Sequence, residues 1–414
     1  MMPLVLIAGV SVRGMTESAV RAGYTVVAID AYADTDLAEI AETRLVSPYT
    51  AHSAAAAARD VPRTSQQARV PAVGVAPVRH DRGDRGDRVA VCYVSNFENH
   101  PDALRQLASG RLLWGNSPAT LAAARTPPGW AKALADAGIA VPRLRTTAPR
   151  PTMSDVVVRW LLKPRSSGGG HGILPWNPGM PVPRRCVLQE RIAGPAGSIA
   201  FAADGRQSIP IAMTRQLIGE RALGAQPFRY CGNILTPADD PTWGADTPLG
   251  RAAAAIAQTA TSAFGLVGVN GIDFIARRGR PVPIEINPRF TAAMELPERR
   301  DNISIFAAHV AGCSDALATF SPLTRPFRGS GAVGKAIVFA RRALTVGPAV
   351  REWLADPNVR DIPRPDTHIP SGAPICSIFA AARTSAECHA QLLRRAERIY
   401  DAVETTDWRM MSRR

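Results

Sequence analysis

The chain has 414 residues, which is enough for two or three domains with hydrophobic cores of their own. Its hydrophobic content of 46% is that of an ordinary globular protein, and no uninterrupted apolar run is long enough to span a bilayer. The formal net charge of +14 comes almost wholly from arginines spread along the chain, since only Lys132, Lys163 and Lys335 are lysines. Because no basic patch is interleaved with aromatic residues, the charge favours an acidic small substrate over nucleic acid.

The cysteines and the first residues bear on location. The cysteines show no C-x-x-C spacing, which argues against a zinc ribbon or a disulfide scaffold and favours the reduced cytoplasm. Residues 1–15 lack a basic start and continue into a predicted strand, turn and helix, so we expect no signal peptide.

Residues 3–30 predict a strand, a loop, a helix and a second strand that ends at Asp30. This is the β-α-β opening of a doubly wound domain. The dinucleotide fingerprint G-x-G-x-x-G is absent, since the loop holds only Gly9 and Gly14. We therefore do not expect an NAD site.

Residues 51–89 are rich in alanine and then in arginine and proline, and we expect a solvated, low-complexity insertion. A strand follows from residue 89, and its end presents Asn96, Glu98 and Asn99. Strand ends in open α/β sheets often face ligands, so Glu98 is a candidate substrate contact.

A helix is predicted from Pro128 to Ala137, and Gly138 ends it. The next strand delivers Lys163 and is followed by a glycine-rich loop from Ser166 to Gly172. Consecutive glycine amides can approach phosphate oxygens closely, and Lys163 could meet the α- and β-phosphates of a nucleotide. An ordinary flexible loop is the alternative, but a lysine in a lysine-poor chain favours the phosphate site.

Residues 266–290 carry the strongest functional signal in the sequence. Two β-rich runs flank a turn at residues 277–280 and predict a strand pair. Glu285 and Asn287 leave the same face of the second strand, and pairing could bring Asp273 beside Glu285. Two carboxylates and an amide oxygen suit Mg²⁺ carrying a nucleotide, with Arg289 as a fork for an anionic oxygen. The alternative is a surface hairpin with solvated charges.

Other segments carry weaker signals. Arg215, at the end of a predicted strand, is a candidate phosphate or carboxylate clamp, and Asn233 is a weaker candidate. The segment 329–336 matches G-x-x-x-x-G-K, but Ala336 replaces the required Ser or Thr and a strand follows, so we predict no P-loop. The rest of the chain predicts a β-rich lobe, with His368 in a turn, and then a C-terminal helix.

These segments together resemble the ATP-grasp enzymes. That family has an acid on one strand and Glu-x-Asn-x-Arg on the next, as at Asp273 and residues 285–289 here, and a phosphate-covering loop like the one after Lys163. The similarity covers most of the chain, in the biotin-carboxylase-like order. The chain looks most like proteins described as carboligases related to biotin carboxylase, some of them associated with tetrahydromethanopterin-linked one-carbon metabolism.

The resemblance implies a set of nucleotide-binding residues. They comprise Lys163, the phosphate-covering loop and the hinge where adenine is bound, with Glu190 as the side chain on adenine: Ser166, Gly168, Gly169, Gly170, His171, Gly172, Gln189, Glu190, Arg191 and Ile192. A basic residue near the 128–137 helix should reach the phosphates, and Arg125 and Lys132 both remain open. The family's acid for the ribose hydroxyls is absent from residues 194–197, so the ribose contact also remains open.

The resemblance further implies catalytic and metal-binding roles. Arg289 would orient the acyl phosphate, Lys163 and Arg215 would balance developing charge, and Asp273, Glu285 and Asn287 would bind Mg²⁺, with Mn²⁺ as an alternative. Arg13 is a candidate substrate contact, as is one of Thr291, Glu295 and Arg299.

The implied architecture is an α/β and α+β ATP-grasp fold. It has an N-terminal doubly wound domain (residues 1–124), an ATP-grasp domain (125–320, with a small lobe at about 145–190 and a large lobe at about 191–320) and a C-terminal β-rich lobe (321–414). The implied activity joins a small carboxylate to an amine through an acyl phosphate, releasing ADP and phosphate. Carboxylation with biotin on a separate carrier and non-catalytic ATP binding are the alternatives, and a homodimer is left open.

Overall fold

The N-terminal part of the chain forms a parallel sheet. The computed structural model describes residues 3–64, 88–149, 158–314, 316–320 and 330–411. Its first sheet has five strands in the order β3-β2-β1-β4-β5: β1 (Leu4–Ala8), β2 (Thr25–Asp30), β3 (Glu42–Leu45), β4 (Ala90–Tyr93) and β5 (Leu112–Leu113). The central strands are continuous apolar runs because helices cover both faces of the sheet. The predicted doubly wound opening is confirmed.

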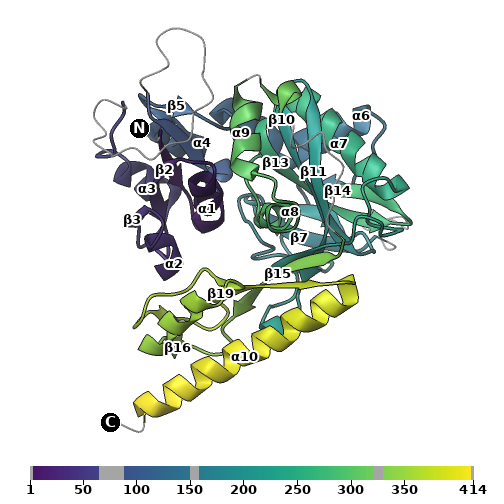
Figure 1. Cartoon of the computed structure of the whole chain (residues 1–414). Helices are drawn as coiled ribbons and strands as arrows, with labels where there is room; N and C mark the ends of the chain where they lie inside the picture. The colour runs from purple at the N-terminus through teal and green to yellow at the C-terminus, as the bar shows by residue number, and fades with distance from the viewer. Residues whose placement is uncertain (1–2, 65–87, 150–157, 315, 321–329, 412–414) are drawn as a thin grey trace.

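Helices surround this sheet and lead to the next domain (Figure 1). They are α1 (Arg13–Arg21), α2 (Thr35–Ala38), α3 (Ala51–Ala57), η1 (Phe97–Asn99), α4 (Pro101–Ala108), α5 (Pro118–Arg125) and α6 (Pro127–Asp136). The prediction of a solvated insertion from residue 51 was wrong at its start. Thr50 and Ser53 form a capping box, and Ala54 and Ala55 of α3 are buried against the sheet. Most of the predicted insertion, residues 65–87, lies outside the described residues.

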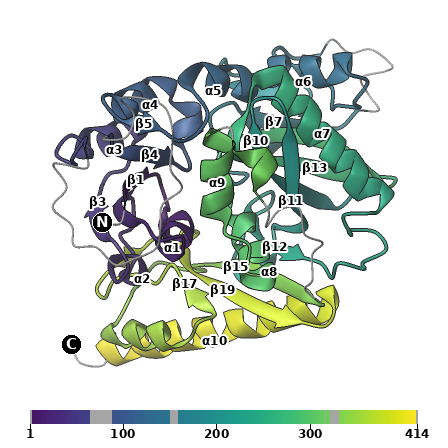
Figure 2. The same ribbon diagram turned by 45° about the horizontal axis from the view of Figure 1, so that its top comes forward.

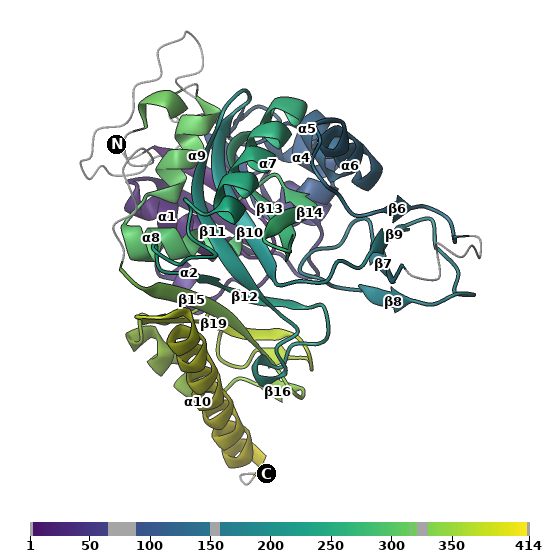
Figure 3. The same ribbon diagram turned by 90° about the vertical axis from the view of Figure 1, so that its right-hand side faces the viewer.

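A small antiparallel sheet of four strands, in the order β6-β9-β7-β8, projects from the rest of the molecule (Figure 3). Its strands are β6 (Leu144–Arg145), β7 (Trp160–Pro164), β8 (Leu174–Trp176) and β9 (Cys186–Glu190). Trp160, Leu162, Trp176 and Leu188 form its own small core.

The largest sheet has eight strands in the order β14-β13-β10-β11-β12-β15-β19-β17. They are β10 (Ala196–Asp204), β11 (Ser208–Ile218), β12 (Tyr230–Leu235), β13 (Val267–Arg277), β14 (Arg280–Asn287), β15 (Ala332–Phe339), β17 (Val359–Arg360) and β19 (Pro374–Ala382). β13 and β14 form the predicted hairpin. Its two-residue turn, Arg278–Gly279, has positive φ at both positions, which suits the right-handed twist of the strands.

One face of this sheet carries a row of polar side chains. Residues paired directly across antiparallel strands share a face. The pairs run from Glu285 and Asp273 through Ser198 and Thr214, and then from Gln216 through Asn233 to Lys335. The sheet therefore presents a polar track that crosses six strands, and this track lines the cavity described below.

Two helices pack on opposite faces of the sheet, as Figure 2 shows. α7 (Pro248–Phe264) covers the apolar face, and it begins at Pro248 behind a Thr247 cap and ends at Gly265 in the left-handed conformation. α9 (Ile305–Cys313) covers part of the polar-track face next to the N-terminal domain. Between β14 and α9 lie η3 (Ala292–Met294) and α8 (Glu295–Asp301).

The C-terminal part of the chain extends the same sheet, since β12 pairs with β15 and β15 with β19. α10 (Ser385–Met411) packs on these strands (Figure 1). The remaining elements are η2 (Arg221–Leu223), η4 (Leu317–Thr319), β16 (Leu344–Thr345), η6 (Pro348–Ala355) and β18 (His368–Ile369). A strand was predicted after the P-loop-like segment 329–336, but β15 begins earlier, at Ala332, and includes Lys335. His368 lies on β18 and not in a turn.

Among the described residues, no helix combines the length and the apolar character needed to cross a membrane.

Candidate active site

The β13–β14 hairpin brings the three predicted metal ligands together. The register pairs Asp273 with Glu285 and places Asn287 opposite Gly271. Asn287 Nδ2 donates to Asp273 Oδ2 at 3.0 Å, and Gln216 Nε2 from β11 donates to Asp273 Oδ1 at 2.8 Å. Two carboxylates and an amide thus meet at one edge of the polar track.

The two carboxylates differ in their charge partners. Burial alone would raise the pKa of Glu285, but the charges of Lys163 and Arg125 outweigh it and lower the pKa to about 2. Burial, followed by the charge of Glu285, raises the pKa of Asp273 to about 6. Asp273 receives hydrogen bonds from neutral amides only, so its negative charge lacks a contacting cation among the described residues. A hard divalent cation fits this donor set, with water and phosphate oxygens completing its shell.

Lys163 and Arg125 clamp Glu285 from two sides. Lys163 Nζ donates to Glu285 Oε2 at 2.9 Å, and Arg125 Nη1 donates to Glu285 Oε1 at 2.6 Å. Arg125 ends α5, where its guanidinium also contacts Asn99 and the Ser167 carbonyl. Lys132, in contrast, is 76% exposed and pairs with Asp136 on the outer face of α6. Of the two open candidates, the structure brings only Arg125 to the site.

The glycine-rich loop packs against the turn before β12. Tyr230 N donates to the Gly169 carbonyl at 3.0 Å. Gly170 has φ +75°, and a Cβ there would lie 1.8 Å from the Phe228 carbonyl oxygen, so only glycine fits. Gly168, Gly169 and Gly170 line the cavity together with Lys163, whereas Ser166, His171 and Gly172 do not.

The predicted hinge comprises the last two residues of β9 and the two residues that follow it. Gln189, Glu190, Arg191 and Ile192 all line the cavity. Glu190 Oε2 accepts from Arg143 N at 3.1 Å, and its Oε1 lies 4.0 Å from Arg277. Both carboxylate oxygens thus face partners within the protein, and the amides of Glu190 and Arg191 donate to the carbonyls of Arg143 and Arg159.

Arg289 lies beside the metal-binding residues and is held from behind. Its Nε donates to Glu98 Oε1 at 2.7 Å, and Glu98 is almost fully buried. Glu98 itself does not line the cavity, so it supports the arginine and is not placed to contact a substrate. Arg215 lines the cavity from an exposed position on β11.

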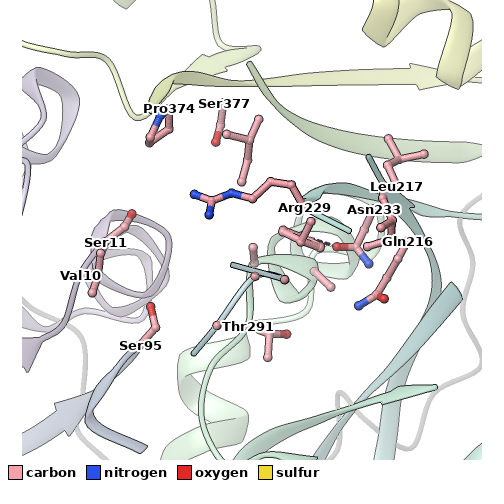
Figure 4. Close-up of a pocket in the computed structure, with 18 of the residues that line it drawn as sticks. Val10, Ser11, Ser95, Gln216, Leu217, Arg229, Asn233, Thr291, Pro374 and Ser377 are labelled. Atoms are coloured by element: carbon pink, nitrogen blue, oxygen red, sulfur yellow. Dashed lines mark hydrogen bonds between the residues drawn. The ribbon is translucent and has the colours of Figure 1, made fainter. Parts of the chain in front are cut away.

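These groups surround one cavity of about 1120 Å³, bounded by the N-terminal domain, the small sheet, the polar track and the C-terminal strands. This volume is at the upper end for ligand pockets, so it has room for a nucleotide and a second substrate. Figure 4 shows Arg229 reaching into it, between Ser11 and Val10 on one side and Ser377 and Pro374 on the other. The Arg229 guanidinium has no hydrogen bond or ion pair to another described residue, although it lies 5.2 Å from the Phe339 ring centroid.

Gln216 and Arg229 also line the cavity, and neither was predicted from the sequence. Gln216 follows Arg215 on β11, and its alternation with Thr214 was the signal that could have placed it on the polar face. Arg229 lies in the turn from Phe228 to Tyr230, where Phe228 has a positive φ, and nothing in the local sequence shows where such a turn points.

Only some of the predicted substrate contacts have side chains that line the cavity without a charged partner. Asn233 and Thr291 line the cavity, and Figure 4 shows both. Arg13 and Glu295 also line it but are paired with one another at 2.6 Å, within a buried charge cluster. Arg299 does not line the cavity, and its guanidinium stacks 3.6 Å from the Phe379 ring centroid.

Known proteins resemble this chain in part of its sequence and in its fold. Residues 129–293 match the family described as ATP-grasp domain. None of the curated proteins compared with the chain matches it. Residues 129–293 are therefore similar to an ATP-grasp domain, and the fold of the chain is that of the ATP-grasp proteins.

Solved structures extend the likeness to the whole chain. An N5-carboxyaminoimidazole ribonucleotide synthetase in complex with ADP matches 98% of this chain and 99% of its own, with a TM-score of 0.64 and 14% identity. An L-amino acid ligase from Bacillus licheniformis matches 95% and 97%, with a TM-score of 0.64 and 14% identity. The biotin carboxylase domain of a single-chain bacterial carboxylase matches 93% and 86%, with a TM-score of 0.64 and 17% identity. The fold is thus ATP-grasp in the biotin-carboxylase-like arrangement.

Proposed function

We propose that the protein is an ATP-dependent ligase. It activates a small carboxylate as an acyl phosphate with Mg-ATP, and an amine then displaces the phosphate to form an amide, ADP and phosphate. The observation that carries this proposal is the meeting of Asp273, Glu285 and Asn287 with Lys163 and Arg289 around one large cavity. Similar folds in an ADP-bound synthetase and an amino acid ligase support it.

The nucleotide would lie between the small sheet and the polar track. Asp273, Glu285 and Asn287 would hold Mg²⁺, or Mn²⁺, and the metal would neutralise charge on the triphosphate. Lys163 and Arg125, which neutralise Glu285 in the free protein, would turn part of their charge to the phosphates. The Gly168–Gly170 backbone offers amides to the same oxygens.

The carboxylate substrate would lie deeper in the cavity. Arg289, held by Glu98, is directed by a fixed salt bridge and suits an acyl phosphate oxygen. Arg229 and Arg215 are further cations in the wall, and Arg229 has no protein partner among the described residues. The glycine loop, docked on Phe228 and Tyr230, would keep water from the acyl phosphate.

The first experiment measures ADP formation by the purified protein with Mg-ATP and a panel of carboxylate and amine pairs. We expect one pair to stimulate ADP release. Glu285→Gln should lower the rate at least about 100-fold, as removal of a preorganised charge does at other active sites. Lys163→Ala should weaken Mg-ADP binding or slow turnover, while Lys132→Ala, which removes an exposed lysine from α6, should change neither.

The alternatives give different outcomes. ADP formation that requires bicarbonate and free biotin would favour carboxylation with a separate carrier. Tight Mg-ADP binding without turnover on any pair would favour a nucleotide-binding protein without ligase chemistry. Activity unchanged in Glu285→Gln would overturn the metal assignment, provided that Mg-ADP binding is also unchanged.

Wider assignments belong to the same proposal. We propose small-molecule partners and not nucleic acid. Several arginines form ion pairs within the protein and so do not contribute to a basic surface, among them Arg13, Arg125 and Arg289. All six cysteines are free, which supports the cytoplasm as the location. A homodimer and a link to tetrahydromethanopterin-dependent metabolism remain predictions.

A further inference from the structure

Aspartates gather at the end of the cavity that adjoins the N-terminal domain, and most of them are satisfied by the protein. Asp30 accepts from the backbone amides of Val12, Tyr32 and Ala33. Asp36 accepts from the amides of Asp361 and Ile362. Asp361 itself pairs with Arg13 at 2.8 Å and lies 3.7 Å from Lys335.

Asp34 is different from its neighbours. It is 6% exposed and lines the cavity, yet its carboxylate makes no hydrogen bond or ion pair with a described residue. It occupies the N-cap position of α2 but does not accept a bond from that helix. A buried acid at this position ordinarily caps its helix or pairs with a cation. The Asp34 carboxylate does neither, and it faces the cavity without a partner among the described residues.

The surroundings of Asp34 add negative charge. Burial, followed by the charges of Asp361, Asp30 and Asp36, raises the pKa of Asp34 well above its ordinary value. Arg13 acts in the opposite direction, but its guanidinium is already shared among Glu17, Glu295 and Asp361. Arg229 also reaches towards this end of the cavity, and its charge acts on Tyr32. No cation contacts the Asp34 carboxylate among the described residues, so a bound cation could pair with it.

The adjoining wall is apolar, although it faces the cavity. Tyr32 is 43% exposed and Leu45 is 42% exposed, and both line the cavity beside Asp34. An aromatic ring and an alkyl side chain next to a buried acid suit an organic cation, whose methylene groups pack while its charge is paired. A metal ion fits less well, because the described residues contain no group of three or more His, Cys, Asp or Glu side chains arranged to hold one.

We infer that Asp34 and Tyr32 form a subsite for a protonated alkyl amine at the end of a substrate remote from the ATP. The aspartates lie at the β15 end of the polar track, where Asp361 contacts Lys335, and the metal-binding residues lie at its β13–β14 end. Four strand spacings separate β13 from β15, which is roughly 19 Å. The ammonium group held at Asp34 is thus distinct from the group that reacts. That this ammonium belongs to a ligase substrate rests on the proposed function, but the subsite itself does not.

The test measures binding and needs no turnover. The full-length protein saturated with Mg-ADP is titrated with 1,5-diaminopentane and, separately, with its uncharged isostere 1,5-pentanediol. We expect the diamine to bind and the diol to bind at least about tenfold more weakly, as for a lost charge-assisted hydrogen bond. Asp34→Asn should weaken diamine binding by a similar factor, and Asp34→Glu should retain the preference for the diamine.

Glu39→Gln is the matched control, because it removes an equal charge from an exposed position close by in the sequence. It should leave diamine binding unchanged. Asp34→Asn removes an unpartnered carboxylate, so its melting temperature and Mg-ADP binding should not fall. Equal binding of diamine and diol by the unaltered protein, or equal diamine binding by it and by a folded Asp34→Asn variant, would overturn the inference. Binding of the diamine without ADP formation on any substrate pair would reject the proposed function alone.

Discussion

The most constrained side chains at the site are supported by residues outside the cavity. Glu98 and Asn99, neighbours in η1, hold Arg289 and Arg125 respectively. One Glu98 oxygen accepts from Arg289, and the other has no partner among the described residues. Burying a carboxylate with one unpaired oxygen lowers the stability of the fold. We infer that Glu98 is retained because its other oxygen fixes the position of Arg289.

Glu98→Gln tests this support. The substitution keeps the shape of the side chain but turns a charge-assisted hydrogen bond into a neutral one, so Arg289 should lose its fixed direction. We expect kcat/KM for the carboxylate substrate to fall about tenfold or more while Mg-ADP affinity is kept. Asp102→Asn, on the exposed face of α4, is the control. Loss of Mg-ADP binding with normal kcat would contradict a role through Arg289.

At the scale of elements, the glycine-rich loop depends on one position. Gly170→Ala should prevent the loop from docking, because the added Cβ meets the Phe228 carbonyl and φ is +75°. Gly168→Ala is a matched control, since nothing lies within 4 Å of a Cβ there. We expect slower ligation and more uncoupled ATP hydrolysis in Gly170→Ala alone, measured as ADP formed per amide. Equal behaviour of the two variants would show that docking is not required.

The packing of α9 on β13 gives a pH-dependent stability. His309 accepts from Val269 N at 3.0 Å through Nδ1, and its Nε2 contacts the Trp114 carbonyl. Burial lowers the pKa of His309 to about 4, while the Trp114 contact acts in the opposite direction. In the unfolded chain the His309 imidazole is therefore protonated near pH 6.5, whereas in the folded protein it is protonated only near pH 4.

The free energy of unfolding should consequently fall as the pH is lowered through this window, by up to about 3 kcal/mol from this group. Urea titrations of the unaltered protein and of His309→Gln at several pH values measure the difference. The slope should be shallower in His309→Gln, while His52→Gln, at an exposed position, should keep the original slope. Parallel pH profiles for all three proteins would contradict the assignment.

What the sequence could predict at this scale follows from the range of the interactions. A two-residue turn alone would pair Asp273 with Ile284, and a β-bulge between Asp273 and Phe274 shifts the register so that Asp273 pairs with Glu285. The hairpin itself was predictable, because the turn and the period-two alternation are local signals. The choice between Arg125 and Lys132 was not, because it depends on how α5 and α6 meet β14. The alanine-rich composition around Ala54 hid α3, although Thr50 and Ser53 carried its capping signal. Arg229 and Asp34 could not be linked to one cavity by any local pattern.

At the scale of the whole molecule, a buried charge cluster joins three parts of the chain. Arg13 from α1, Glu295 from α8, Lys335 from β15 and Asp361 after β17 alternate in sign, and Glu295 and Asp361 each contact both cations. The pKa of Glu295 is lowered, since the charges of Arg13 and Lys335 outweigh the opposing effect of burial. Arg13 also pairs with Glu17, so the charges balance only in part, and removing one member leaves a buried ion without its partner.

Lys335→Met should therefore destabilise the protein by about 3 kcal/mol or more, the usual result of leaving a buried ion without its partner. The double variant with Glu295→Leu should recover part of the loss. Lys132→Met, which removes an exposed pair, should cost roughly 0.5 kcal/mol or less. Urea unfolding measures all three, and similar losses in the two lysine variants would show that the cluster is not a stabilising unit.

The continuity of the eight-stranded sheet decides how the cavity can open. β12 and β15 share main-chain hydrogen bonds, so the C-terminal strands cannot part from the floor of the cavity without unzipping a sheet. In the part of the chain that the structure describes, the four-stranded sheet is joined to the rest through residues 137–143 and 191–195 and through side-chain and loop contacts. We therefore expect the small sheet to move when a nucleotide enters the cavity, while the floor of the cavity stays fixed.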